Sequence, residues 1–292
     1  MSVIELKTTG IIGKIDLKKP HIKALYWILF SFSMVVVFVS MFPPLWIMFS
    51  SLKSTKEFFA IPPTLIPQSF HPEKIVTIWN EVNFARYTLN SLIMLSGSVV
   101  CGILVNGLTA YGLSILKPKG SKFILSLILW SMMVPATISI VPLFTNIVNL
   151  NLLNSYVPLW LSYGCNAFWV VVFKSFFDSL PKSFIEAARI DGANSMTIFF
   201  RIVLPLSKAA CGVVAIFSAN TAWSDFLLPY LVLKNRNLQT MVVKIFLMRS
   251  DGTLPVDYTI TALLFTIIPP VILFAIFQKQ IIGGMTVGGV KG

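Results

Sequence analysis

Only a few polar residues of this sequence stand where they could do chemistry. Asp225 interrupts an apolar run and follows Asn220, Thr221 and Trp223. A carboxylate within a membrane span is costly, so we expect Asp225 to face a bundle interior, a partner helix or a wet cavity. The amide, hydroxyl and indole groups beside it could supply hydrogen bonds and an aromatic face, which is the usual chemistry of contact with a sugar. The alternative is that Asp225 lies near the outer interface and pairs with a basic residue of a partner subunit.

Residues for catalysis or metal binding are not grouped in this sequence. There is no Gly-rich loop ending in Lys-Ser or Lys-Thr that could hold ATP phosphates. His21 and His71 are isolated, and Cys101, Cys165 and Cys211 lack the spacing of metal ligands. No nucleophile–base pair or cluster of acids and histidines indicates an enzyme or a proton-coupled carrier. We therefore predict no enzyme activity and no catalytic, cofactor or metal site in this chain.

A second polar stretch, residues 183–205, has the local signals of two short helices. Ser183 and Glu186 have the spacing of a capping box, which predicts a helix that begins at Ser183. Gly192 stands where a left-handed cap would end that helix. The stretch therefore predicts a sharp turn at Gly192.

The second of these helices is predicted to carry an apolar ridge. Asn194 or Ser195 can cap its start, and Pro205 is expected to stop it. Apolar residues recur three or four positions apart, which places them on one face. These residues are Met196, Phe199, Phe200 and Val203.

The same stretch resembles the EAA loop of membrane-spanning subunits of ABC importers that work with a soluble substrate-binding protein. The matching residues are Glu186-Ala187-Ala188, Gly192 and Ile202-x-Leu204-Pro205. In that family the loop is cytoplasmic and inserts into a cleft on the ATPase subunit. The alternative is an amphipathic cytoplasmic connector in which Glu186 is only a cap.

The resemblance assigns roles to the residues of the loop. It implies that Glu186 contacts the ATPase, that Gly192 permits the turn, and that Met196, Phe199 and Phe200 form the docking ridge. The residues implied in ATPase coupling are Glu186, Ala187, Ala188, Asp191, Gly192, Ala193, Met196, Phe199, Phe200, Leu204 and Pro205.

Composition indicates an all-α integral membrane protein. Hydrophobic residues make up 56% and charged residues 12% of the chain, and the mean hydropathy is +0.82. The net charge of +12 comes from basic residues spread over short loops rather than gathered on a soluble domain. This distribution argues against a nucleic-acid partner and in favour of membrane topology.

Long charge-free runs predict six transmembrane helices after a cytoplasmic N-terminal arm, residues 1–23. Residues 24–292 form the permease domain, in which the loop 183–205 connects the fourth and fifth spans. The outside loops are 53–86 and 234–257. The predicted spans are about 24–52, 87–116, 123–148, 156–177, 207–233 and 258–278.

The distribution of positive charge supports this topology. Of the 23 Lys and Arg residues, fifteen fall in segments predicted inside and eight in segments predicted outside. Cytoplasmic loops carry such an excess of Lys and Arg, so we expect both termini inside. The loop 183–205 then lies in the compartment that contains ATP.

Further motifs resemble the carbohydrate branch of these permeases, which includes the smaller membrane subunit of the maltose importer. Ser224 departs from that branch, where Asn is common, and Ala209-Ala210 stand where a Pro is frequent. The matching motifs are Asn90-Ser91-Leu92, Ala110-Tyr111-Gly112-Leu113, Trp223-Ser224-Asp225-Phe226 and Gly288-Gly289-Val290-Lys291-Gly292.

This resemblance implies a type I ABC importer permease in the bacterial cytoplasmic (inner) membrane, forming half of the translocation pathway for oligosaccharides. The implied partners are a second, non-identical permease subunit, two ATPase subunits that hold ATP and Mg, an extracytoplasmic solute-binding protein and membrane lipid. Two alternatives remain. The solute could be an acidic, uronate- or alginate-like oligosaccharide or glycerol phosphate, or the chain could be an autonomous six-span channel or carrier.

Overall fold

The computed structural model describes residues 19–288, and every regular element in that range is helical. The chain divides into two compact units, residues 1–71 and 72–292. This boundary differs from the one expected after residue 23. Most of the predicted N-terminal arm, residues 1–18, lies outside the described residues.

The first unit contains one long apolar helix followed by a short closed loop. Helix α1 (Pro20–Ser51) extends over the first predicted span, and its apolar side chains are almost all exposed. Helix α2 (Thr55–Phe58) follows, where the Ser54 hydroxyl accepts a hydrogen bond from the Glu57 N–H. The Glu57 carboxylate in turn accepts from the Thr64 hydroxyl, at 3.0 Å. This loop is therefore held by its own polar side chains.

The second unit is built around α4 (Phe84–Tyr111), which the π-helix η2 (Gly112–Leu116) continues. Helix α4 packs against α7 (Val157–Gly164), α8 (Ala167–Asp178) and α12 (Lys208–Ser224). Gly97 allows the close approach of α7, because a Cβ at this position would lie 2.2 Å from the Trp160 ring. Small residues serve the same purpose where membrane helices cross.

Several predicted spans are broken helices rather than continuous ones. The third contains α5 (Ser121–Ser131), a 3₁₀ turn η3 (Ala136–Ser139) and α6 (Ile140–Asn149). Pro135 precedes η3 with an extended backbone, and proline cannot donate the hydrogen bond that would continue α5. The fourth span is divided between α7 and α8. Each of these two predicted spans therefore consists of shorter helices in the structure.

The fifth span is also interrupted, whereas the sixth is continuous. Helix α12 ends at Ser224 and α13 (Leu227–Val232) follows it. Helix α15 (Val256–Gly288) includes the whole sixth predicted span. Among residues 19–288, three helices are long and apolar enough to cross a membrane alone, namely α1, α4 with η2, and α15. One pair of helices bent at a break, Ser195–Leu206 and Lys208–Ser224, is long and apolar enough when taken together.

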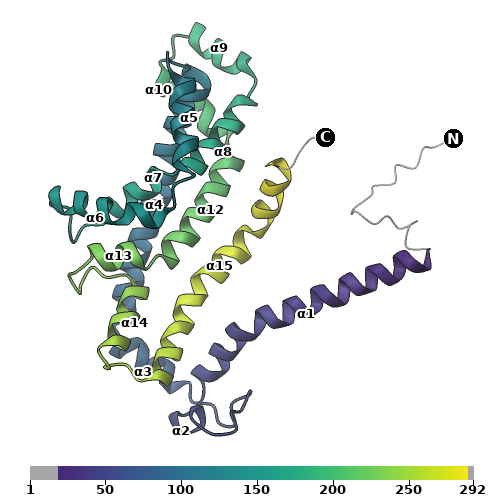
Figure 1. Cartoon of the computed structure of the whole chain (residues 1–292), viewed down its shortest axis with the longest axis vertical. Helices are drawn as coiled ribbons and strands as arrows, with labels where there is room; N and C mark the ends of the chain where they lie inside the picture. The colour runs from purple at the N-terminus through teal and green to yellow at the C-terminus, as the bar shows by residue number, and fades with distance from the viewer. Residues whose placement is uncertain (1–18, 289–292) are drawn as a thin grey trace. The chain divides into compact units, whose positions relative to one another are not determined.

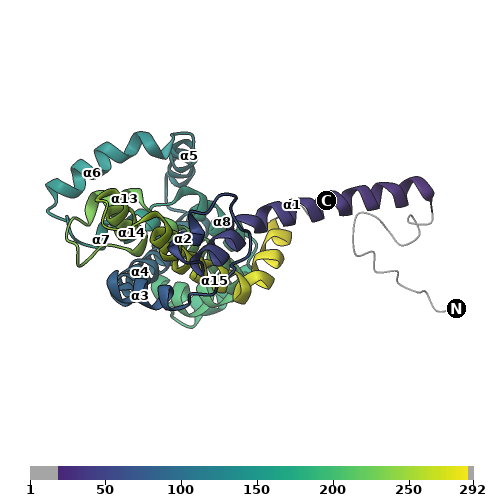
Figure 2. The same cartoon turned by 90° about the horizontal axis from the view of Figure 1, so that it is seen from below.

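The connecting segments of the second unit lie at its two ends. Two short helices, α9 (Lys182–Ile190) and α10 (Ser195–Ile198), lie at one end. At the opposite end lie α3 (Glu73–Glu81) and α14 (Met241–Ser250), both within the loops predicted outside (Figure 1). The view along the long axis shows α6 at the edge of this unit (Figure 2).

Candidate coupling surface and polar interior

Helix α9 begins one residue earlier than its sequence signal indicates. Pro181 is the N-cap, with φ −60° and ψ 123°, and no side chain caps the helix. Ser183 therefore lies inside the first turn, and the predicted capping box with Glu186 is wrong. The rigid ring of Pro181 fixes the entry of the chain, so the helix starts without a hydroxyl cap.

The turn after α9 has the geometry expected of Gly192. Its φ is +79°, which confirms the left-handed cap. The Gly192 N–H donates to the Arg189 carbonyl at 3.1 Å, and the Ala193 N–H donates to the Ala188 carbonyl at 2.9 Å. These two bonds form a Schellman motif. No heavy atom lies within 4 Å of an added Cβ, so the backbone conformation alone demands glycine here.

Asn194 caps the second helix, as predicted, because its side-chain oxygen accepts from the Thr197 N–H at 2.8 Å. After α10 the chain continues as the π-helix η4 (Phe199–Val203) and α11 (Leu204–Leu206). Pro205 does not stop the helix, which is a correction. It is the second residue of α11, where a missing N–H is tolerated. The axis then turns by 82° into α12.

The predicted apolar ridge is divided between the core and the surface. Phe199 is 0% exposed and Val203 is also buried, whereas Phe200 is 47% exposed and Met196 is exposed too. Phe199 cannot form part of a docking ridge, because its ring belongs to the core. The π-helix changes the angular period, so the spacing of three or four no longer marks one face.

Four exposed apolar side chains at this end of the unit form what we name the coupling surface. They come from α9 and from the helix after it, and they are Phe184, Ile190, Met196 and Phe200. Phe184 and Ile190 were not among the residues predicted from the sequence. Both are large apolar residues outside the buried stripe of α9, which contains Ile185 and Ala188, and this position could have indicated their exposure.

The other predicted coupling residues differ in exposure. Glu186, Ala187, Asp191, Gly192 and Pro205 are exposed, Ala193 and Leu204 are half-buried, and Ala188 is buried. Ala188 thus belongs to the core that supports the surface.

Phe199 connects this surface to the membrane helices. Its ring lies against the Tyr111 ring of α4, with centroids 5.4 Å apart. One buried cluster joins Phe199 and Val203 to Phe173 and Phe177 of α8. The coupling surface is therefore fixed to α4 and α8 by a continuous apolar core.

Asp225 lies at the break between α12 and α13, at the C-cap of α12. It is partly buried, and its carboxylate interacts with the Tyr163 hydroxyl of α7 and with the N–H groups of Leu227 and Leu228. Asp225 thus faces a neighbouring helix of its own unit, one of the environments expected for it. The break leaves the Leu227 and Leu228 N–H groups without helical partners, and the Asp225 carboxylate is their acceptor.

The three residues before Asp225 do not form one site with it. Trp223 is buried, and its indole N–H donates to the Thr266 carbonyl of α15 at 2.9 Å. The ring packs between helices and offers little surface to a sugar, so its role in the pathway stays a prediction. Asn220 and Thr221 are exposed on α12.

Asn106 is a polar residue of the interior that the sequence analysis missed. Its side-chain amide donates to the Tyr163 carbonyl at 2.9 Å, and its oxygen accepts from the Asn166 N–H at 3.0 Å. These bonds satisfy the backbone at the break between α7 and α8. The available signal was an isolated amide within a charge-free run. A polar side chain inside a membrane span needs a hydrogen-bond partner.

This architecture defines a class. An all-helical membrane unit with broken spans, and with an apolar helix–turn–helix at one end, has the form of a membrane transport subunit.

Comparison with known proteins gives the family. Residues 98–287 match the family described as "Binding-protein-dependent transport system inner membrane component". The chain is 31% identical to the arabinooligosaccharides transport system permease protein AraQ of Bacillus subtilis, covering 89% of this chain and 94% of that one. It is 34% identical to the sulfoquinovosyl glycerol transport system permease protein SmoH of Agrobacterium fabrum, covering 86% and 89%.

A solved structure has the same fold. It is the crystal structure of a bacterial ABC transporter involved in the import of the acidic polysaccharide alginate. The TM-score is 0.78 at 22% identity, covering 89% of this chain and 98% of that one. The chain therefore belongs to the family of inner-membrane components of binding-protein-dependent transport systems, as a permease subunit of an ABC importer.

Proposed function

We propose that this chain forms half of the translocation pathway of a bacterial importer for oligosaccharides. Relatives named for arabinooligosaccharides and for sulfoquinovosyl glycerol support a carbohydrate solute. A second, non-identical permease subunit forms the other half, and two separate ATPase subunits hold ATP and Mg. An extracytoplasmic binding protein delivers the solute. Both termini are cytoplasmic.

The coupling surface is the observation that carries this proposal. It gathers four large apolar side chains on two short helices, whereas water-exposed helix ends favour polar residues. A cleft on an ATPase subunit would cover them. Glu186 and Asp191, both exposed beside this surface, provide polar contacts at its rim.

The arrangement of the second unit fits a two-sided transporter. Helices α9 and α10 lie at the end opposite α3 and α14 (Figure 1). With the coupling surface in the cytoplasm, α3 and α14 face the outside, where a binding protein docks. The predicted excess of Lys and Arg inside supports the same orientation.

Movement of the ATPase subunits would reach the pathway through packed side chains. A force on Met196 and Phe200 acts on the same helix as Phe199, whose ring lies against Tyr111 of α4. The breaks at Asn166 and Asp225 divide two spans into shorter bodies, which can tilt separately. Closure of the ATPase dimer would in this way open the cavity between the two permease subunits outward.

The test is ATPase activity in liposomes that contain this chain, its copurified partners and its cognate binding protein. We expect stimulation by the loaded binding protein with one class from a panel of neutral and acidic oligosaccharides. Gly192→Pro and Glu186→Lys should leave the protein in the membrane and lower both transport and ATPase stimulation. No copurifying ATPase, or activity indifferent to every sugar, would contradict the proposal.

A further inference from the structure

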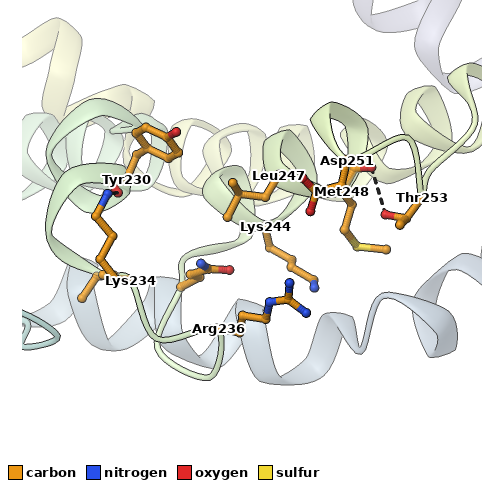
Figure 3. A pocket seen from close by; sticks show the side chains of 10 residues that line it. Tyr230, Lys234, Arg236, Lys244, Leu247, Met248, Asp251 and Thr253 are labelled. Atoms are coloured by element: carbon orange, nitrogen blue, oxygen red, sulfur yellow. Dashed lines mark hydrogen bonds between the residues drawn. The ribbon is translucent and has the colours of Figure 1, made fainter.

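A basic cavity lies between the end of α13, the loop after it and α14. Its volume is about 480 Å³, within the range of about 300–1,000 Å³ that small-molecule sites occupy. Figure 3 shows side chains from α13, from the loop after it and from α14 around the cavity. The residues that line it are Tyr230, Leu233, Lys234, Arg236, Gln239, Lys244, Leu247, Met248, Asp251 and Thr253.

The cavity has an excess of positive charge. Lys234, Arg236 and Lys244 line it together with one carboxylate, Asp251. Within residues 19–288, no carboxylate lies within ion-pair distance of these three cations. Figure 3 shows the head groups of Arg236 and Lys244 pointing toward the same space. Like charges held near one another favour an anion between them.

Gln239 adds a hydrogen-bond acceptor without a partner. Its side chain is only 4% exposed, and its Oε1 atom accepts no hydrogen bond from any described residue. A buried amide oxygen without a donor is unfavourable, because it has lost its hydrogen bonds to water. A hydroxyl group of a bound molecule in the cavity would supply the missing donor.

Tyr230 gives the cavity a rigid aromatic wall. Its ring lies against Phe226 at 5.2 Å and Phe246 at 5.6 Å between centroids. Lys234 lies over the ring, with its Nζ atom 5.0 Å from the centroid, and donates to the Tyr230 carbonyl. The ring is therefore a fixed wall of the cavity, packed against two aromatic rings and covered by the Lys234 head group.

The loop that carries Arg236 and Gln239 is fixed by α4. The Asn90 side chain donates to the carbonyls of Asn237 and Gln239, both at 2.9 Å. The Ser91 hydroxyl accepts from the Met241 N–H at 2.9 Å. Asn90 and Ser91 therefore hold the cavity wall in one shape, which reduces the entropy lost on binding.

The α6–α7 turn fixes the other side of the same loop. The Tyr156 hydroxyl donates to the Leu238 carbonyl at 2.7 Å, and the Asn154 side chain accepts from the Asn235 N–H at 2.6 Å. Lys234 and Arg236 thus lie on a loop that hydrogen bonds hold in place on both sides.

We propose that this cavity binds a carboxylate-bearing sugar unit of the transported solute. Arg236 and Lys244 hold the carboxylate, Gln239 accepts from a ring hydroxyl, and Tyr230 forms a fixed wall beside the sugar. The inference rests on the proposed function, and it selects acidic over neutral oligosaccharides as the substrate class. The relatives AraQ and SmoH are named for a neutral and an anionic solute respectively, so membership of the family does not make this choice.

The test compares two sugars that differ by one carboxylate. Binding of galacturonate and of galactose to the complete, purified transporter is measured by calorimetry, without binding protein. We expect galacturonate to bind about tenfold more tightly than galactose, as charge-assisted bonds to Arg and Lys imply. The double variant Arg236→Gln/Lys244→Gln should remove this difference.

A matched control separates the cavity from general surface charge. Arg249→Gln and Lys56→Gln remove two positive charges from the outside loops, at residues that do not line the cavity. We expect this control to bind galacturonate like the unaltered transporter, and Gln239→Leu to weaken binding of both sugars. Equal binding of the two sugars, or galacturonate binding unaffected by the double variant, would overturn the inference.

A carboxylate could also come from the surface of the docked binding protein. The ATPase assay distinguishes this source, because the double variant would then raise the half-saturating concentration of binding protein whichever sugar it carries. That result, with galacturonate binding unchanged, overturns the sugar assignment. It leaves the proposed function intact, since stimulation by loaded binding protein is measured in the same preparation.

Discussion

The ring of Phe199 lies against the ring of Tyr111, with centroids 5.4 Å apart and planes inclined by 55°. The two residues belong to the helix behind the coupling surface and to the central helix α4. A Cβ on Gly107, one turn from Tyr111, would come within 3.5 Å of the Phe199 ring. The ring therefore occupies a fitted site on α4, and its neighbour Phe200 is left on the surface.

Phe199→Ala and Phe200→Ala should affect different properties, although the residues are adjacent. Loss of the buried Phe199 ring leaves a cavity and should cost about 3–5 kcal/mol of stability. Loss of the exposed Phe200 ring should change stability little but weaken association with the ATPase subunits. Thermal unfolding and the amount of copurified ATPase measure the two effects. Equal unfolding temperatures for both variants would contradict this assignment.

The sequence predicts local features of the coupling loop better than it predicts which side chains are buried. The Gly192 turn and the Asn194 cap depend on a few neighbouring residues, and both were predicted. Phe199 and Phe200 were placed on one ridge because an α-helical period was assumed. The π-helix η4 changes that period, and no residue of the segment signals it.

Long-range partners were beyond the reach of the sequence for a different reason. Asn106 bonds to Tyr163 and Asn166, which lie 57 and 60 residues away. Asn90 bonds to Gln239 across 149 residues. Both amides are visible in the sequence as polar residues in apolar runs, but the partner of each depends on which helices pack together.

Asn106→Leu should destabilise the transporter, because Asn106 bonds to backbone groups at the break between α7 and α8. The substitution leaves the Tyr163 carbonyl and the Asn166 N–H without their partner, at about 1–3 kcal/mol for each group. Asn220→Leu is the control, because Asn220 is exposed on α12. Thermal unfolding in detergent compares them. An Asn106→Leu variant as stable as the control would show that these two groups find other partners.

The loop around α2 should loosen in acid. The Gln68 N–H donates to the Glu57 carboxylate and lowers its pKa from the ordinary value of 4.5, although burial acts in the opposite direction. A lowered pKa in the folded state stabilises the loop above the unfolded value. That contribution is lost as the pH falls below about 4.5 through the folded pKa.

Hydrogen exchange measures this loosening. The protection factor of the Gln68 amide should fall in acid in the unaltered protein. In Glu57→Gln it should not depend on pH, because the amide oxygen accepts the same bond but does not titrate. A protection factor that falls equally in both proteins would assign the pH dependence to another group.

The ion pair between Lys74 and Asp257 should behave as a buried pair. Their side chains are 6% and 0% exposed, and the Lys74 Nζ atom lies 2.9 Å from Asp257 Oδ2. The pair joins α3 to the first turn of α15. Lys74→Met leaves a buried carboxylate behind and should cost about 3–5 kcal/mol.

Removal of both charges should be far less harmful. In Lys74→Met/Asp257→Leu no buried charge is left unpaired, so most of the lost stability should return. A double-mutant cycle by thermal unfolding measures the coupling energy between the two positions. If the double variant is less stable than Lys74→Met alone, Asp257 stabilises the start of α15 independently of Lys74. The α3–α15 junction would then not depend on the ion pair with Lys74.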